Sequence, residues 1–145
     1  MIAPMPRAAA LAALFLAAGC AWFASPPPEY PVQTLESGLV VHDLVVPESG
    51  APVERGDAVT IHFELRLADD GLVESSRDQG RALHFEVGAG AVPPGLEQGV
   101  LGMRLFGRRR IVVPPALGYG AAGRAPLIPP DATLTFDVEL MEHDQ

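Results

Sequence analysis

Hydrophobic and polar residues alternate most regularly over residues 59–67, with the sequence VTIHFELRL. The apolar set is Val59, Ile61, Phe63, Leu65 and Leu67, and the polar set is Thr60, His62, Glu64 and Arg66. Because successive side chains of a strand point to opposite faces, this pattern predicts a strand with one buried face. The same alternation in LTFDVEL, residues 134–140, predicts a second strand of this kind.

Shorter apolar stretches predict the remaining strands. They are flanked by turn-forming residues and cover residues 37–46, 72–76, 82–87 and 108–113. The sequence DDG at 69–71 provides an Asp-Gly turn, so the chain is expected to return antiparallel after residue 67.

One segment, residues 93–103, has the spacing of a helix. Leu96, Val100 and Leu101 fall on one face, and Pro94 stands near the first turn, where a missing N–H is tolerated. About five antiparallel strands and one short helix predict an α+β domain. A curved sheet half-wrapped around the helix allows each to bury its apolar face against the other.

A long loop is expected at residues 118–130, GYGAAGRAPLIPP. It has no acidic residue, is rich in glycine and proline, and carries the apolar pair Leu127 and Ile128. An ordinary connection between two strands is about two to five residues long. Two interpretations remain open: a loop shaped to hold a ligand, or a covering loop whose Leu and Ile fill the core.

The first 20 residues have the layout of an export signal. Arg7 is followed by an apolar run and by Gly19, directly before Cys20. The ending LAAGC resembles the bacterial lipobox, in which the signal is cut before an acylated cysteine. We therefore predict a lipoprotein signal peptide over residues 1–19 and a lipid on Cys20. Ala21, in place of aspartate, favours delivery to the outer membrane.

An uncleaved helical anchor over residues 8–24 is the alternative, since 17 apolar residues reach the low end of a membrane span. Both interpretations place the rest of the chain outside the cytoplasm, on a membrane. Residues 20–36 contain four prolines and no periodicity, which predicts a tether after the lipidated cysteine. The globular domain is then expected over residues 37–145.

The amino-acid composition and net charge argue against several classes of function. The 18 acidic and 10 basic residues give a net charge of −8, which argues against general nucleic-acid binding. A single cysteine excludes an internal disulfide and a cysteine-built zinc site. Neither a metal nor a cofactor is expected, because the four histidines fall in separate predicted elements without ligand-type spacing: His42, His62, His84 and His143.

Four stretches together carry a family resemblance. They are SSRD (75–78), VPPGLEQGVLGM (92–103), RRRIVVPPALGYG (108–120) and PLIPPDATLTFDVELM (126–141). In order and spacing they closely resemble the FKBP-type peptidyl-prolyl cis-trans isomerases, over almost the whole of residues 37–145. The resemblance implies a curved antiparallel sheet around one helix, with a pocket between them for a prolyl peptide or a macrolide inhibitor. Residues 118–130 then correspond to the flap of that pocket.

The resemblance also implies site residues, position by position. Those expected to act in catalysis are Phe63, Glu74, Tyr119 and Phe136, with the Tyr119 hydroxyl donating to a substrate or ligand carbonyl. Those expected to bind substrate are Val73, Leu83, Val92, Pro93, Leu96, Leu127 and Ile128.

Several positions depart from the family pattern. Phe63 stands where tyrosine is usual, Glu74 replaces aspartate, Val73 replaces phenylalanine, and Leu96 occupies a position that is often tryptophan. Pro93 stands where the family donates a backbone N–H, which proline lacks. We therefore expect a wider, less aromatic pocket and weak binding of macrolide inhibitors.

Rotation about an X-Pro bond meets a barrier of about 18–20 kcal/mol but needs no bond to a proton or nucleophile. An apolar pocket that strips water from the carbonyl favours the twisted amide. The expected function is isomerisation of proline-containing polypeptides after export, by a monomer. The alternative is a prolyl-peptide-binding module or holdase chaperone of the same fold with little turnover.

Overall fold

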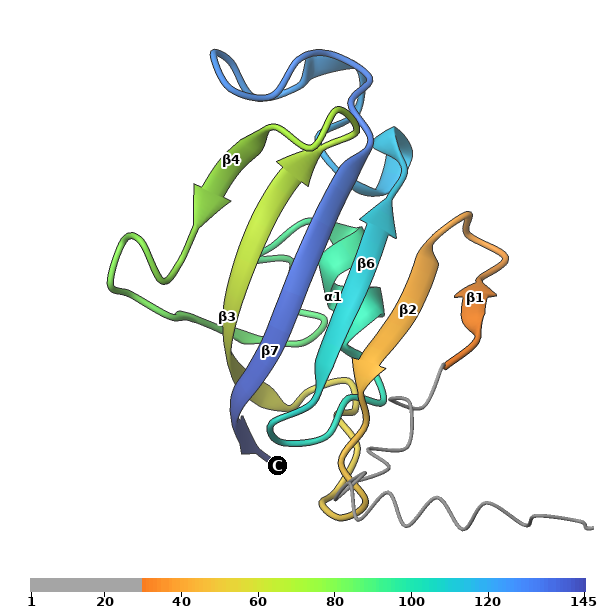
Figure 1. Cartoon of the computed structure of the whole chain (residues 1–145), viewed down its shortest axis with the longest axis vertical. Coiled ribbons are helices and arrows are strands. Elements are labelled where there is room, and N and C mark those ends of the chain that lie inside the picture. Colours follow the sequence, from red (N-terminus) through yellow and green to blue (C-terminus); the bar gives the residue numbers. More distant parts are fainter. Residues whose placement is uncertain (1–29) are drawn as a thin grey trace, which may run out of the picture.

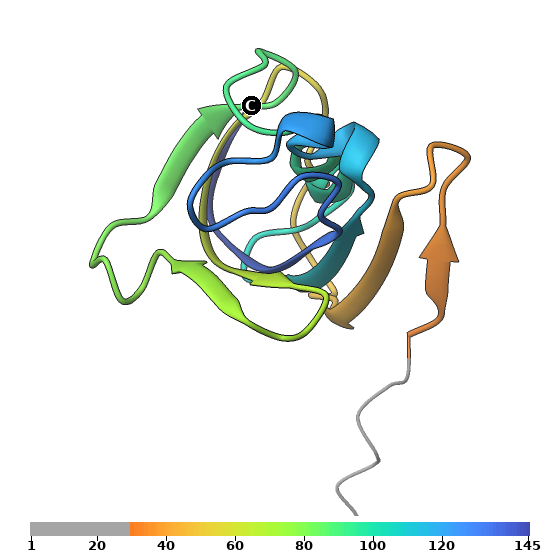
Figure 2. The same ribbon diagram turned by 90° about the horizontal axis from the view of Figure 1, so that it is seen from above.

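The computed structural model describes residues 30–145, and the predicted signal peptide, Cys20 and most of the predicted tether lie outside them. Within residues 30–145, seven antiparallel strands form one sheet in the order β1-β2-β6-β7-β3-β4, and β5 pairs with β3 as well. The strands are β1 (Val32–Thr34), β2 (Val40–Val45), β3 (Ala58–Leu67), β4 (Leu72–Ser75), β5 (Leu83–Glu86), β6 (Arg108–Val113) and β7 (Leu134–Asp144). The curved sheet wraps around α1 (Pro94–Val100), the single α-helix among the described residues, as Figures 1 and 2 show. The predicted α+β fold is confirmed.

The centre of the sheet is the long pairing of β3 with β7, in which Leu65 lies opposite Phe136. The predicted alternation is present in both strands. Val59, Ile61 and Leu65 are fully buried, whereas the polar residues between them are only half-buried. β7 continues to Asp144, beyond the predicted end at residue 140.

Two glycines let α1 pack closely against β6. A Cβ atom added to Gly99 would lie 2.5 Å from Cδ1 of Ile111, and one added to Gly95 would overlap Cγ1 of Val113. Leu96 is also buried against the sheet. The helix is shorter than the predicted segment, because Leu101, with φ of −58° and ψ of 133°, leaves the helical conformation directly after Val100.

The predicted strand count of about five is too low, and the expected tether does not extend to residue 36. β1 lies inside that segment and pairs antiparallel with β2, with Val32 opposite His42. All three residues of β1 are exposed, so backbone hydrogen bonds at a sheet edge, rather than an apolar face, hold the strand. Within residues 30–145, no helix is long and apolar enough to cross a membrane.

Candidate active site

Two aromatic side chains from the central strands form the floor of the candidate site. Phe63 of β3 and Phe136 of β7 are buried, with ring centroids 6.0 Å apart and ring planes inclined at 51°. Leu96 of α1 and Ile128 of the flap belong to the same buried cluster. Four predicted site residues from four parts of the chain therefore meet in one apolar cluster.

Four other predicted site residues are partly exposed and pack against the same buried cluster. They are Val73 of β4, Leu83 of β5, Val92 before α1, and Tyr119. Because these residues are only partly covered, the cluster has some exposed apolar surface at these positions as well as forming a core.

The flap is a folded loop between β6 and β7 that crosses the upper end of the sheet (Figures 1 and 2). Within the flap, the backbone amide of Arg124 donates to the Ile128 carbonyl at 2.8 Å, and the Ile128 amide donates to the Arg124 carbonyl at 2.9 Å. Gly123 has φ of 63°, and an added Cβ would lie 2.5 Å from the Ile128 carbonyl oxygen, so only glycine fits there.

The two apolar flap residues have different surroundings. Ile128 is only 2% exposed and fills the core, as the covering-loop interpretation expects. Leu127 is 61% exposed and lines a hollow of about 280 Å³ between β4 and the flap. The flap therefore both covers the core and presents an apolar side chain beside the site.

Glu74 lines the same hollow and is half-buried. Its Oε1 accepts a hydrogen bond of 3.2 Å from Nε2 of Gln79. Arg124 lies on the flap side of the hollow, so an acidic and a basic group border its apolar wall.

Arg124 is a site residue that the sequence did not predict. Its guanidinium carbon lies 5.7 Å from the centroid of the Tyr119 ring, and its Nη1 donates to the Tyr119 hydroxyl at 3.3 Å. The only signal in the sequence is that a basic residue stands within a glycine- and proline-rich loop.

Ser76 is the second residue whose role the sequence did not predict. This buried side chain accepts the backbone N–H of Phe63 at 2.8 Å, and its Oγ lies 2.9 Å from Nδ1 of His62. Since the amide of Ser76 also donates to the Phe63 carbonyl at 3.0 Å, Ser76 fixes the backbone that carries the floor aromatic.

Pro93 lies at the start of α1, half-buried, with φ of −54°. Its carbonyl accepts the amides of Leu96 at 3.0 Å and Glu97 at 3.3 Å, which starts the helix. Having no N–H, it offers a ligand no backbone donor at this point.

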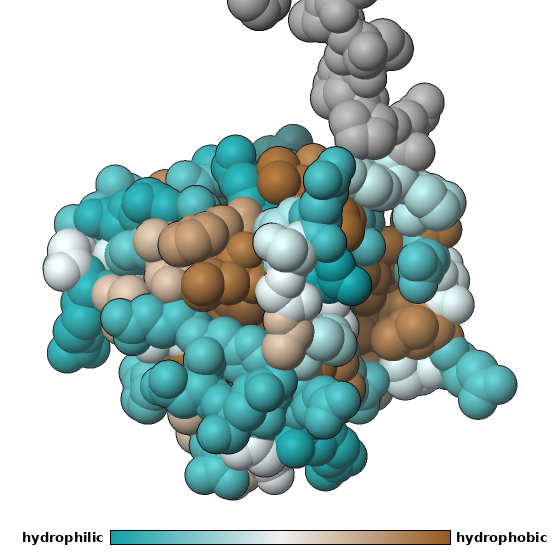
Figure 3. Space-filling view, turned by 90° about the horizontal axis from the view of Figure 1, so that it is seen from below, coloured by the Kyte–Doolittle hydropathy of each residue, from teal (hydrophilic) through white to brown (hydrophobic). Residues whose placement is uncertain are grey.

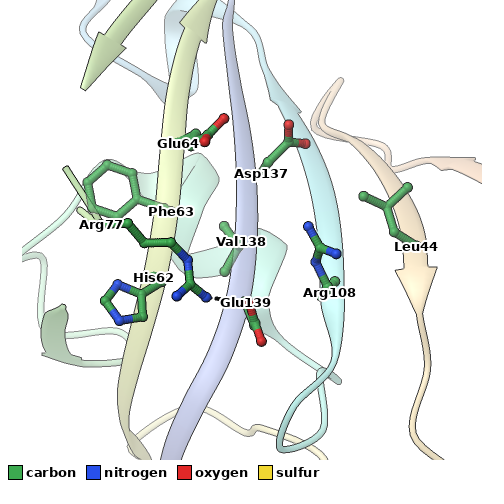
Figure 4. Close-up of a pocket in the computed structure, with 9 residues that line it drawn as sticks. All are labelled: Leu44, His62, Phe63, Glu64, Arg77, Arg108, Asp137, Val138 and Glu139. Atoms are coloured by element: carbon green, nitrogen blue, oxygen red, sulfur yellow. Dashed lines mark hydrogen bonds and ion pairs between the residues drawn. The ribbon is translucent and has the colours of Figure 1, made fainter. Parts of the chain in front are cut away.

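A second hollow, of about 120 Å³, lies on the outer face of the sheet (Figure 4). Its wall is formed largely by the polar side chains of the alternating strands, including the ion pair of Arg77 with Glu139 at 2.6 Å. Of the predicted site residues, Phe63 alone lines it. A charged hollow of this kind has little apolar wall with which to desolvate a prolyl amide.

The described residues contain no group of three or more His, Cys, Asp or Glu side chains that could hold a metal ion. Three of the histidines have other partners. His62 contacts Ser76, His84 contacts Thr60 at 3.0 Å, and His143 contacts Asp57 at 2.7 Å.

In the described part of the chain, a curved sheet wraps around one short helix, which is the fold expected of an FKBP-type prolyl isomerase. Residues 50–141 match the FKBP-type peptidyl-prolyl cis-trans isomerase family, and the chain belongs to that family.

Relatives are found by sequence as well as among solved structures. FK506-binding protein 2 from Yarrowia lipolytica is 41% identical over 90 residues, which are 62% of this chain and 62% of that protein. Peptidyl-prolyl cis-trans isomerase FKBP10 from Mus musculus is 39% identical, over 77% of this chain and 22% of its own length. The match therefore spans less than two thirds of either relative.

Two crystal structures share the fold at TM-scores near 0.7. FkpA from Escherichia coli has a TM-score of 0.70 and 34% identity, over 78% of this chain and 51% of FkpA. AtFKBP13 has a TM-score of 0.71 and 31% identity, over 77% of this chain and 98% of AtFKBP13.

Proposed function

We propose that this protein catalyses cis-trans isomerisation of X-Pro bonds in polypeptides. The observation that carries the proposal is the convergence of Phe63, Phe136 and Tyr119 on one partly open apolar cluster in a member of this family. Such a site needs no nucleophile, since the barrier comes from amide resonance alone.

The apolar floor removes water from the carbonyl of the bound X-Pro amide. A twisted amide carries less charge on oxygen than a planar one, so desolvation raises the free energy of the planar state more. The Tyr119 oxygen accepts a hydrogen bond from Arg124, which leaves the phenolic proton available for a substrate carbonyl. Glu74, which accepts a hydrogen bond from Gln79, has no proton-transfer role in this mechanism.

A protease-coupled assay with proline tetrapeptides tests this function. We expect the protein to accelerate cis-to-trans conversion, with a preference for apolar residues before proline. Peptide binding without acceleration would favour the alternative, a prolyl-peptide-binding module or holdase chaperone. The absence of an N–H at Pro93 and the aliphatic Val73 and Leu96 are the features that favour that alternative.

We further propose that the clients are exported polypeptides and that the protein acts on the periplasmic face of an outer membrane, as a lipid-anchored monomer. The support is the sequence over residues 1–20, with its signal-like run before Cys20. Cys20→Ser should leave uncleaved precursor and abolish incorporation of labelled fatty acid. Equal labelling of the variant and the wild type would contradict lipidation at this residue.

A further inference from the structure

The loop between α1 and β6 presents a large aromatic side chain to solvent. Phe106 is 60% exposed and has φ of 67°, in the left-handed region that a bulky residue rarely adopts. Glycine or asparagine would satisfy this backbone at lower cost. The fold therefore gives no reason for phenylalanine at this position.

This loop is held firmly by backbone hydrogen bonds. The amide of Phe106 donates to the Leu140 carbonyl at 2.8 Å, and the Leu140 amide donates to the Gly107 carbonyl at 3.1 Å. A further bond of 2.8 Å, from Gly107 to the Arg104 carbonyl, closes the turn. Phe106 is thus displayed at a fixed place beside β7.

Aliphatic side chains at the end of β2 lie near this turn. Val45 pairs with Arg108 across the sheet and is 44% exposed, and Val46 is 40% exposed. Both valines line a hollow of about 370 Å³ together with Met103 and Arg104. Apolar surface is visible from this side of the molecule in Figure 3.

Two arginines border these apolar side chains without a carboxylate partner. Arg104 donates to the backbone carbonyls of Pro47 and Glu48, and Arg108 forms no ion pair with any of residues 30–145. The next two arginines differ, because Arg109 is paired with Asp43 and Arg110 with Asp137. Arg108 lies opposite Glu139 in the sheet and lines the outer hollow with Glu64, Asp137 and Glu139. These three carboxylates are paired with other arginines, namely Arg66, Arg110 and Arg77. Glu48 is the further acidic side chain beside Arg104, so basic charge slightly exceeds acidic charge here although the whole chain carries −8.

We propose that Val45, Val46, Phe106, Arg104 and Arg108 form a docking surface for membranes that contain anionic phospholipid. Aromatic and aliphatic side chains enter the headgroup region, while guanidinium groups pair with lipid phosphates. The aromatic residue in a strained turn and the unpaired arginines carry this proposal whether or not Cys20 is lipidated.

The path of the chain adds a second argument, which rests on the proposed membrane anchoring. Since β1 is antiparallel to β2 and Val32 lies opposite His42, the chain before Val32 leads toward the Val45 end of β2. Cys20, the proposed site of lipidation, stands ten residues before Tyr30, a reach of at most about 36 Å. The docking surface therefore lies at the anchored end, and the flap lies at the opposite end of the sheet (Figure 1).

Depth-dependent quenching in vesicles tests the proposal. The full chain, with Trp22→Phe, receives one new tryptophan: Phe106→Trp in the docking surface, or Leu72→Trp as the matched control. Leu72 is 49% exposed but lies on β4, at the flap end. Vesicles contain phosphatidylcholine and phosphatidylglycerol, with brominated acyl chains as the quencher.

We expect strong quenching at position 106 and little at position 72, with loss of the quenching at 106 after Arg104→Glu and Arg108→Glu. Equal quenching at both positions, or quenching at 106 that survives the two charge reversals, would overturn the proposal. So would an absence of quenching at 106, the result expected if a protein partner covers this surface.

A stability measurement checks that Phe106 is not needed for folding. Phe106→Asn should leave the melting temperature of the full chain unchanged or raise it, because asparagine tolerates positive φ. A clear fall in melting temperature would mean that Phe106 stabilises the fold, which would remove the reason for assigning it to a membrane.

Discussion

The guanidinium of Arg124 lies against the face of the Tyr119 ring and donates a hydrogen bond to the hydroxyl of the same residue. Both residues belong to the flap, and the turn at Gly120–Ala122 brings them together. Arg124 therefore orients the phenol that is expected to donate to substrate, and acts as a positioning residue.

Tyr119→Phe should lower kcat/KM for a proline tetrapeptide by about 2- to 10-fold, because one hydrogen bond contributes about 0.5–1.5 kcal/mol. Arg124→Gln should lower it less in the wild-type background and have no further effect when combined with Tyr119→Phe. Full additivity of the two changes would contradict the positioning role of Arg124.

Phe136→Ala should lower both stability and turnover. Removal of a buried phenylalanine costs about 3–5 kcal/mol of unfolding free energy, measured by urea denaturation. Phe85→Ala is the matched control, since Phe85 is as buried as Phe136 but lies on β5 and is not a predicted site residue. At temperatures where both variants are folded, only Phe136→Ala should lose isomerase activity. Equal activity losses would mean that Phe136 supports the fold alone.

Pro93→Ile should tighten macrolide binding, measured by calorimetric titration. The substitution restores a backbone N–H where the family resemblance places a donor to the inhibitor. The recovered hydrogen bond also removes the cost of burying an inhibitor carbonyl without a partner. Together these effects should raise the affinity about tenfold.

Pro94→Ala is the control for this substitution. It also removes a proline from the first turn of α1, but at an exposed position. Macrolide affinity should not change in this control. Identical affinities for wild type and Pro93→Ile would show that the missing donor does not limit binding.

The pair of Asp57 with His143 predicts a pH dependence of stability. The hydrogen bond to His143, aided by the Glu54 amide, lowers the pKa of Asp57 below its ordinary value. A lowered folded-state pKa stabilises the fold above the unfolded-state pKa, and this contribution is lost as pH falls through the folded-state value. Urea unfolding below about pH 4 should therefore show a steeper loss of stability for wild type than for Asp57→Asn. Parallel pH profiles would contradict this assignment.

Residues that alternate between a buried and a solvated face were predictable from the sequence. Phe63 and Phe136 fall on the apolar face of their strands, and that alternation is enough to place both toward α1. β1 was not predictable in this way, because its three residues are exposed and only edge hydrogen bonds define it.

Contacts that depend on turn geometry were also beyond the sequence. Arg124 reaches Tyr119 only because a short 3-10 turn and the Arg124–Ile128 bridge fold the flap back on itself. The exposure of Phe106 depends on a left-handed backbone that no periodicity reveals, since period-based arguments apply to regular strands and helices.

The most direct test of the central claim is the cis-trans exchange rate of a proline peptide, measured by NMR exchange spectroscopy with substoichiometric amounts of the protein. Isomerase activity predicts exchange cross-peaks between the cis and trans resonances that are absent without protein and weaken with Tyr119→Phe. Shifts of the peptide resonances on binding, with an exchange rate unchanged from the free peptide, would contradict it.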